Sequence, residues 1–184
     1  MGEAAQLWVV CDTSGSMSEA GKPAVLRSLL SFLSLASELA YEDISPIRAK
    51  TVLWNENPEV FASIPNATDL RFSGRPDMDA LLAMLSASVP SDSNVSILFL
   101  TDGQWSQDYL QAFQKWFRTQ PRVDLVFVAV GYDANLRQLK KIVGSDAVFT
   151  AEEIVAALYA VRSTHRSAGT TTESYHKTIE GGGS

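Results

Sequence analysis

The sequence has a single cysteine, Cys11, and only two histidines. One cysteine excludes an intrachain disulfide, and its commoner use is as a small buried residue. Both histidines, His165 and His176, lie near the C-terminal end, and histidine is the side chain used most often as a general base. We therefore expect no Cys-His or Ser-His nucleophile in the main part of the chain.

Long apolar runs and an excess of positive charge are also missing. No apolar stretch reaches the roughly 18 residues of a membrane-spanning helix, and no secretory signal opens the chain. The net charge of −6 argues against a general surface for nucleic acid or anionic membrane. These absences predict a cytoplasmic protein that binds neither nucleic acid nor membrane.

The common nucleotide and nucleophile motifs are absent too. There is no Gly-x-x-x-x-Gly-Lys loop, no Gly-x-Gly-x-x-Gly and no Gly-x-Ser-x-Gly elbow. An aspartate at a strand end can accept a phosphoryl group. The haloacid-dehalogenase pattern would need a second acid two residues after Asp12, where Ser14 stands. A phosphoryl-transfer or hydrolase enzyme is therefore the least favoured function, and we expect no catalysis.

What the sequence does contain is an alternation of apolar strand patterns and amphipathic helix patterns. The continuous apolar runs at 7–11, 95–101 and 123–130 are typical of parallel strands buried on both faces. Segments 47–54 and 59–64, joined by Asn55-Glu56-Asn57-Pro58, predict a hairpin. We expect an α/β fold: a doubly wound, mostly parallel six-stranded sheet with one antiparallel edge strand and helices on both faces.

The apolar periodicity ends near Arg162. Residues 163–184 are rich in Ser, Thr and Gly, and the chain closes with Gly-Gly-Gly-Ser. This composition predicts a domain over residues 1–162 followed by a flexible tail at 163–184, ending in a linker-like segment.

Two strand ends carry the residues of chemical interest. The run Leu7–Cys11 leads into Asp12-Thr13-Ser14-Gly15-Ser16, and the run at 96–100 leads into Thr101-Asp102-Gly103. In an open α/β sheet, ligands bind at the carboxyl ends of strands where the winding direction reverses. Two carboxylates about 5 Å apart there repel by about 3 kcal/mol at an effective dielectric constant near 20. A divalent cation would relieve that repulsion, and hydroxyl and carboxylate oxygens suit Mg²⁺ or Mn²⁺.

These two motifs resemble those of the von Willebrand factor type A (vWA) domain and its metal-ion-dependent adhesion site, over roughly residues 6–162. The resemblance implies a Rossmann-like fold in which Ser14 and Ser16 bind the ion directly, while Asp12 and Asp102 act through bound water. Bacterial intracellular vWA proteins associated with tellurium resistance are among the similar groups.

The third family motif differs in this chain. Most metal-binding members have a threonine in a loop before the second major helix, whereas this loop reads Ser73-Gly74-Arg75-Pro76-Asp77. Pro76 takes the threonine position and offers no ligand atom. Asp77 or Ser73 could substitute, with N-capping of the next helix as the alternative role of Asp77. Arg75 could instead place its fixed positive charge where the ion would lie.

The implied function is a metal-dependent protein-interaction module. Few anionic ligands leave the ion electrophilic, so it binds an Asp or Glu carboxylate of a partner. The resemblance suggests multi-protein systems built on AAA+ ATPases or kinase–phosphatase pairs. A metal-free vWA scaffold is the alternative. Trp54 and Trp105 are further candidates for a contact surface, although core packing is the commoner use of tryptophan.

Overall fold

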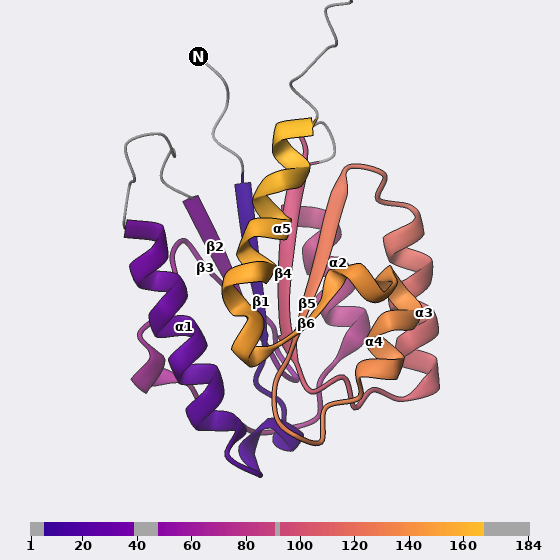
Figure 1. Ribbon diagram of the computed structural model, residues 1–184. Coiled ribbons are helices and arrows are strands. Elements are labelled where there is room, and N and C mark those ends of the chain that lie inside the picture. Colours follow the sequence, from indigo (N-terminus) through magenta and orange to yellow (C-terminus); the bar gives the residue numbers. More distant parts are fainter. Residues whose placement is uncertain (1–5, 39–47, 91–92, 168–184) are drawn as a thin grey trace, which may run out of the picture.

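In the computed structural model, residues 6–38, 48–90 and 93–167 are described, and they form a helix–sheet–helix sandwich (Figure 1). The sheet has six strands in the order β3-β2-β1-β4-β5-β6. The strands are β1 (Gln6–Asp12), β2 (Arg48–Trp54), β3 (Glu59–Phe61), β4 (Val95–Thr101), β5 (Val123–Ala129) and β6 (Val148–Thr150). Neighbouring strands are parallel except for β2 and β3. The expected fold class, with one antiparallel edge strand, is confirmed.

Helices cover both faces of the sheet. They are α1 (Lys22–Glu38), α2 (Met78–Ser88), α3 (Gln107–Arg118), α4 (Leu136–Val143) and α5 (Ile154–Ser167). The apolar sides of α1 and α5 pack on one face, and those of α2, α3 and α4 pack on the other. Among the described residues, none of the helices combines the length and the apolar character that a membrane crossing would need.

The central strand β1 shows how the two cores are divided. Val9 and Cys11 belong to the core under α1 and α5, whereas Trp8 and Val10 belong to the core under α2, α3 and α4. Successive side chains of a strand point to opposite faces, so a continuous apolar run serves both cores. The chain winds from β1 to β2 on one side and from β4 to β5 on the other. The winding therefore reverses between β1 and β4, and the loops after both strands lie at the lower edge in Figure 1.

One expectation about the rim is wrong, and an alternative left open by the sequence is decided. The edge strand β3 ends at Phe61 instead of Ile64, and Ile64 packs partly buried against the core under α1. Trp54 and Trp105 are 0% and 7% exposed, so they are core residues and not a contact surface. Both join an aromatic cluster around Phe99 under α2 and α3. Burial of these large apolar rings stabilises the fold, which explains why they lie in the core.

The last helix extends past the expected domain boundary. α5 ends at Ser167, whereas the apolar periodicity of the sequence stops near Arg162. Its first half is anchored by buried Ile154, Ala157, Leu158 and Val161, and a helix that has nucleated there can continue through polar residues. His165 therefore belongs to a helix and not to the tail. Residues 168–184, the remainder of the expected tail, lie outside the described residues.

Candidate metal centre

The loop after β1 brings together three of the expected oxygen donors. Asp12 is the last residue of β1, and its Oδ1 accepts hydrogen bonds from Ser14 N at 3.0 Å and from Ser14 Oγ at 2.6 Å. The hydroxyl oxygens of Ser14 and Ser16 are 3.3 Å apart. Asp12 and Ser14 are almost fully buried, whereas Ser16 is exposed. The loop thus has a buried inner side and one hydroxyl that reaches the surface.

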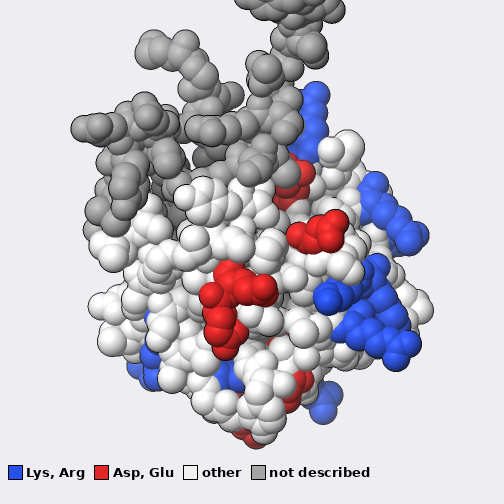
Figure 2. Space-filling model, in the orientation of Figure 1, with Lys and Arg blue, Asp and Glu red and all other residues white. Residues whose placement is uncertain are grey.

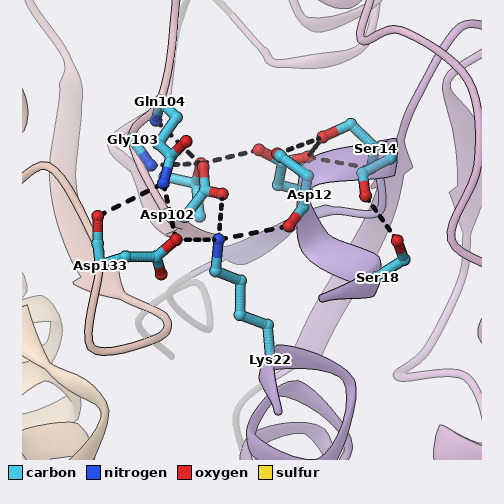
Figure 3. Close-up of polar contacts among 11 residues, drawn as sticks. Asp12, Ser14, Ser18, Lys22, Asp102, Gly103, Gln104 and Asp133 are labelled. Carbon is cyan, nitrogen blue, oxygen red and sulfur yellow. Dashed lines mark hydrogen bonds and ion pairs between the residues drawn. The ribbon is translucent and has the colours of Figure 1, made fainter. Parts of the chain in front are cut away.

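The end of β4 lies beside this loop (Figure 3). Thr101 Oγ1 donates to Asp12 Oδ2 at 2.8 Å and accepts from Gly103 N at 3.0 Å. Asp102 is 1% exposed, and its Oδ1 accepts from Gln104 N at 3.0 Å. These contacts turn both carboxylates toward the space between the two strand ends.

The third loop is tied to the first by its backbone. Gly15 N donates to Gly74 O at 3.0 Å, and Ser73 N donates to Thr13 O at 3.1 Å. The Asp77 side chain caps α2, because its Oδ1 accepts from Ala80 N at 2.9 Å. The structure therefore places this loop at the site but shows Asp77 in the capping role. Ligation of a metal by Asp77 stays a prediction.

The exposed surface of this third loop carries the other residues singled out from the sequence. Pro76 O accepts a hydrogen bond from Tyr109 Oη at 2.8 Å, which fixes the loop against α3. Ser73 and Arg75 are exposed. Because Arg75 is exposed, its side chain does not occupy the buried space between Asp12 and Asp102.

A buried lysine at this site was not anticipated from the sequence. Lys22, the first residue of α1, is 2% exposed, and its Nζ lies 2.8 Å from Asp102 Oδ2 and 2.9 Å from Asp133 Oδ2 (Figure 3). Nζ also donates to Ser16 O at 3.2 Å. The position of Lys22 in the first turn of a helix could have indicated this pairing, because a positive charge there opposes the helix dipole and needs a compensating partner. Asp133 repeats the pattern of an acid shortly after a buried strand.

Burial and charge give the two sides of the site different electrostatics. Burial raises the pKa of Asp12 to about 6, against hydrogen bonds from Ser14 and Thr101 that lower it, and the Asp102 charge adds to the rise. Burial lowers the pKa of Lys22, but hydrogen bonds and charge attraction from Asp102 and Asp133 outweigh it, so the net pKa is raised. The hydrogen bond from Lys22 in turn lowers the pKa of Asp133. Asp102 is thus paired with a cation, whereas Asp12 accepts hydrogen bonds from the uncharged groups of Ser14 and Thr101.

The donor set fits a hard divalent ion. Adjacent ligands of an octahedral Mg²⁺ or Mn²⁺ lie about 3 Å apart, close to the 3.3 Å between the two serine hydroxyls. The Ser14 proton points to Asp12, which leaves the lone pairs of Ser14 Oγ available to an ion. Within the described residues, no group of three or more His, Cys, Asp or Glu side chains could hold a metal. Ligation of an ion by Ser14 and Ser16, with support from Asp12 and Asp102, stays a prediction.

Charged side chains on the surface are distributed unevenly. Figure 2 shows acidic side chains in separate places on the face covered by α1 and α5, and basic side chains gathered at the side over α4. That helix carries Arg137, Lys140 and Lys141.

Solved structures similar to this chain are vWA domains of low sequence identity. A von Willebrand factor type A protein from Catenulispora acidiphila has a TM-score of 0.60 at 17% identity, with 90% of this chain and 43% of that chain covered. The manganese-loaded TRAP protein of Plasmodium vivax has a TM-score of 0.62 at 19% identity, covering 85% and 72%. Proximal thread matrix protein 1 from the mussel byssus, with a zinc-occupied MIDAS motif, has a TM-score of 0.58 at 14% identity, covering 86% and 47%. The chain spans less than half of the first of these proteins.

A search of curated proteins found no match. A family model does match, however, and it covers residues 2–163, which include both strand-end motifs and the five helices given above except for the end of α5. The model is described as the VWA domain of the cobalamin biosynthesis protein CobT. The chain therefore belongs to the CobT VWA-domain family.

Proposed function

We propose that this domain is a metal-dependent protein-interaction module. A divalent ion, Mg²⁺ or Mn²⁺, is held by Ser14 and Ser16 with support from Asp12 and Asp102, and it binds an Asp or Glu carboxylate of a partner protein. The exposed Ser16 marks the side from which the partner approaches. The domain itself catalyses no reaction.

One observation carries this proposal. Asp12 is 1% exposed, and its carboxylate is hydrogen-bonded to Ser14 and Thr101, but no cation among the described residues forms an ion pair with it. A buried carboxylate normally has a cation or metal as its partner, because burial of an unpaired charge is costly. The 3.3 Å between the serine hydroxyls supplies the matching pair of direct ligands beside it.

The comparisons with known proteins support metal binding and suggest a kind of partner protein. Two of the similar structures hold manganese or zinc, one of them in a MIDAS motif. The family description names cobalamin biosynthesis, so the proposed partner is another protein of that machinery. An AAA+ ATPase is one candidate and a kinase–phosphatase pair is another. A likeness to the vWA proteins associated with tellurium resistance stays a prediction.

The test uses Mn²⁺ and acetate as probes. Mn²⁺ bound at the site keeps water in its open positions, and the relaxation rate of water protons reports those waters. We expect Mn²⁺ to bind with a dissociation constant of about 1 mM or below, as for the weaker oxygen-ligand sites. Acetate should then lower the relaxation rate by displacing bound water.

The matched control removes a different hydroxyl from the same loop. Ser14→Ala removes a proposed ligand, whereas Ser18→Ala removes a hydroxyl that donates to Gly15 O and not to the site. Ser14→Ala should weaken Mn²⁺ binding at least tenfold, and Ser18→Ala should leave it unchanged. Equal binding by both variants, or no binding by the unaltered protein at millimolar Mn²⁺, would contradict the proposal.

A second candidate function is a metal-free scaffold that binds an acidic partner through Arg75. It is favoured by the ion pair between Lys22 and Asp102, which already neutralises one acid of the site, and by Pro76 at the usual threonine position. Arg75 is exposed beside Gly74, whose carbonyl accepts from the first loop. Guanidinium binds carboxylate in a bidentate geometry.

The chelator EDTA distinguishes between the two candidate functions. Glutarate binding can be followed by NMR with EDTA present and absent. If the ion mediates binding, EDTA abolishes it and Arg75→Ala has little effect. If Arg75 mediates it, EDTA has no effect and Arg75→Ala weakens binding, while Arg71→Ala, on an exposed neighbour in the same segment, does not.

A further inference from the structure

The buried ion pair of Lys22 belongs to the site but to none of the proposed ligand roles. An ammonium group has three N–H donors. Three acceptors surround this one: Asp102 Oδ2 at 2.8 Å, Asp133 Oδ2 at 2.9 Å and Ser16 O at 3.2 Å. They come from the loops after β1, β4 and β5, so one side chain connects three loops at the same edge of the sheet.

The chain holds Lys22 in this position by its backbone. Lys22 N donates to Glu19 O at 3.0 Å, which closes a tight turn in which Ala20 and Gly21 have φ of 55° and 76°. Positive φ at a residue other than glycine is unfavourable, so packing must maintain it. On the other side, a Cβ on Gly131 would lie 2.8 Å from Lys22 Cε. The lysine stem therefore occupies space that the backbone leaves for it.

The two acids that share Lys22 are not equivalent. Asp102 is 1% exposed and belongs to the proposed ion site. The Asp133 side chain is 33% exposed, lies outside the proposed ligand set, and is held by Gln104 Nε2 at 2.9 Å from its Oδ2. The ammonium can consequently remain paired with Asp133 when an ion engages Asp102.

We propose that Lys22 is an internal counter-cation that competes with the divalent ion for Asp102 and remains on Asp133 when the ion binds. The inference rests on the proposed function, because it concerns the affinity of the same site. Without an ion, Lys22 neutralises Asp102 and keeps the three loops together. With an ion present, like charges repel and the Lys22–Asp102 contact weakens. The lysine thus sets a threshold concentration below which the site stays free of metal.

Calorimetric titration with Mn²⁺ of four proteins tests this competition: the unaltered chain, Lys22→Met, Asp133→Asn and the double variant. Lys22→Met should bind Mn²⁺ at least tenfold more tightly, because the competitor is gone. Asp133→Asn should bind at least threefold more weakly, because the ammonium then depends on Asp102 alone. In the double variant, Asp133→Asn should have no such effect, since it acts through Lys22. Lys115→Met, an exposed lysine in the last turn of α3, controls for loss of one charge.

Thermal unfolding gives a second readout. In EDTA, Lys22→Met should melt at a lower temperature than the unaltered protein, and Mn²⁺ should raise its melting temperature by more. If Lys22→Met does not fold, Asp133→Asn remains as the test, because the altered side chain is partly exposed. Weaker Mn²⁺ binding by this variant then supports the inference, and unchanged binding overturns it.

The outcomes separate this inference from the proposed function. The titration of the unaltered protein tests the ion site, and the ratio between variants tests the competition. Equal or weaker binding by Lys22→Met overturns the inference and makes Lys22 a support of Asp102, while the ion site stands. Binding by Lys22→Met alone supports the competition but contradicts the proposed function, because Lys22 then keeps the ion out of the unaltered chain. Binding by neither overturns both.

Discussion

At the residue scale, Gly131 makes room for the buried lysine. Its φ is 98°, and a Cβ there would meet Lys22 Cγ and Asp133 Oδ1, each at 2.9 Å. Two penalties are therefore combined at this position. A positive φ costs an alanine about 1–2 kcal/mol, and overpacking adds about 1–3 kcal/mol.

We expect Gly131→Ala to lower the free energy of unfolding by about 2–5 kcal/mol, the sum of both penalties. Gly144→Ala is the matched control, because Gly144 has φ of 87° and no atom within 4 Å of an added Cβ. With ψ of 177° it lies in a backbone region nearly restricted to glycine, so it should lose about 1–3 kcal/mol from the backbone alone. Urea unfolding in EDTA measures both, and equal losses would show that Lys22 is not crowded by Gly131.

Individual residues also show how far the site could be predicted. Asp12, Ser14 and Ser16 follow one apolar strand, and Asp102 follows another, so a sheet-edge cluster was visible in the sequence. Lys22 was not, because its partner Asp102 is 80 residues away in the chain and only the folded loops bring them together. The sequence showed that Pro76 offers no ligand, but not that the lysine neutralises one acid.

At the element scale, the start of α2 depends on Asp77. The side chain accepts from Ala80 N at 2.9 Å, and its backbone carbonyl accepts from Trp54 Nε1 at 2.8 Å. An N-cap acceptor contributes about 1 kcal/mol, and a negative charge at a helix N-terminus adds about 0.3–1 kcal/mol.

Asp77→Ala should therefore lower the free energy of unfolding by about 1–2 kcal/mol, and Asp77→Asn by less than half of that, since asparagine caps equally well. Chemical denaturation in EDTA gives the stabilities, and Mn²⁺ titration of Asp77→Asn gives the second result. Unchanged affinity agrees with a purely capping role. A tenfold weaker affinity would instead make Asp77 a ligand.

Elements were easier to predict than their ends. The runs that became β1, β4 and β5 are mostly apolar, without the alternation of a half-exposed strand, and such runs are typical of parallel strands buried between helices. The end of β3 at Phe61 and that of α5 at Ser167 were missed, because packing and helix propagation decide them and local composition does not.

At the scale of the whole molecule, stability rests on two cores on opposite faces of one sheet. Phe99 of β4 is fully buried in the core under α2, α3 and α4. Its ring lies 5.4–5.7 Å from those of four aromatic neighbours, Trp54, Trp105, Phe113 and Phe127. Such pairs add stability beyond their buried area.

We expect Phe99→Ala to lower the free energy of unfolding by about 3–5 kcal/mol, a large part of the 5–15 kcal/mol typical of a domain. Phe32→Ala, at a side chain that is 36% exposed on α1, should lose about 1 kcal/mol or less. Denaturation followed by circular dichroism compares the two. Similar losses would mean that the aromatic cluster is not a main source of stability.

The only thiol of the chain lies in the middle of this sheet. Cys11 is 0% exposed, and burial raises the pKa of its thiol, so the reactive thiolate is suppressed in the folded protein. A thiol reagent can react only with molecules in which β1 has separated from its neighbours. Because Asp12 is the next residue, each such opening also takes the metal centre apart. The rate at which a thiol reagent labels the unaltered protein therefore reports how often the assembled site opens. An ion that binds at the site would lower that labelling rate.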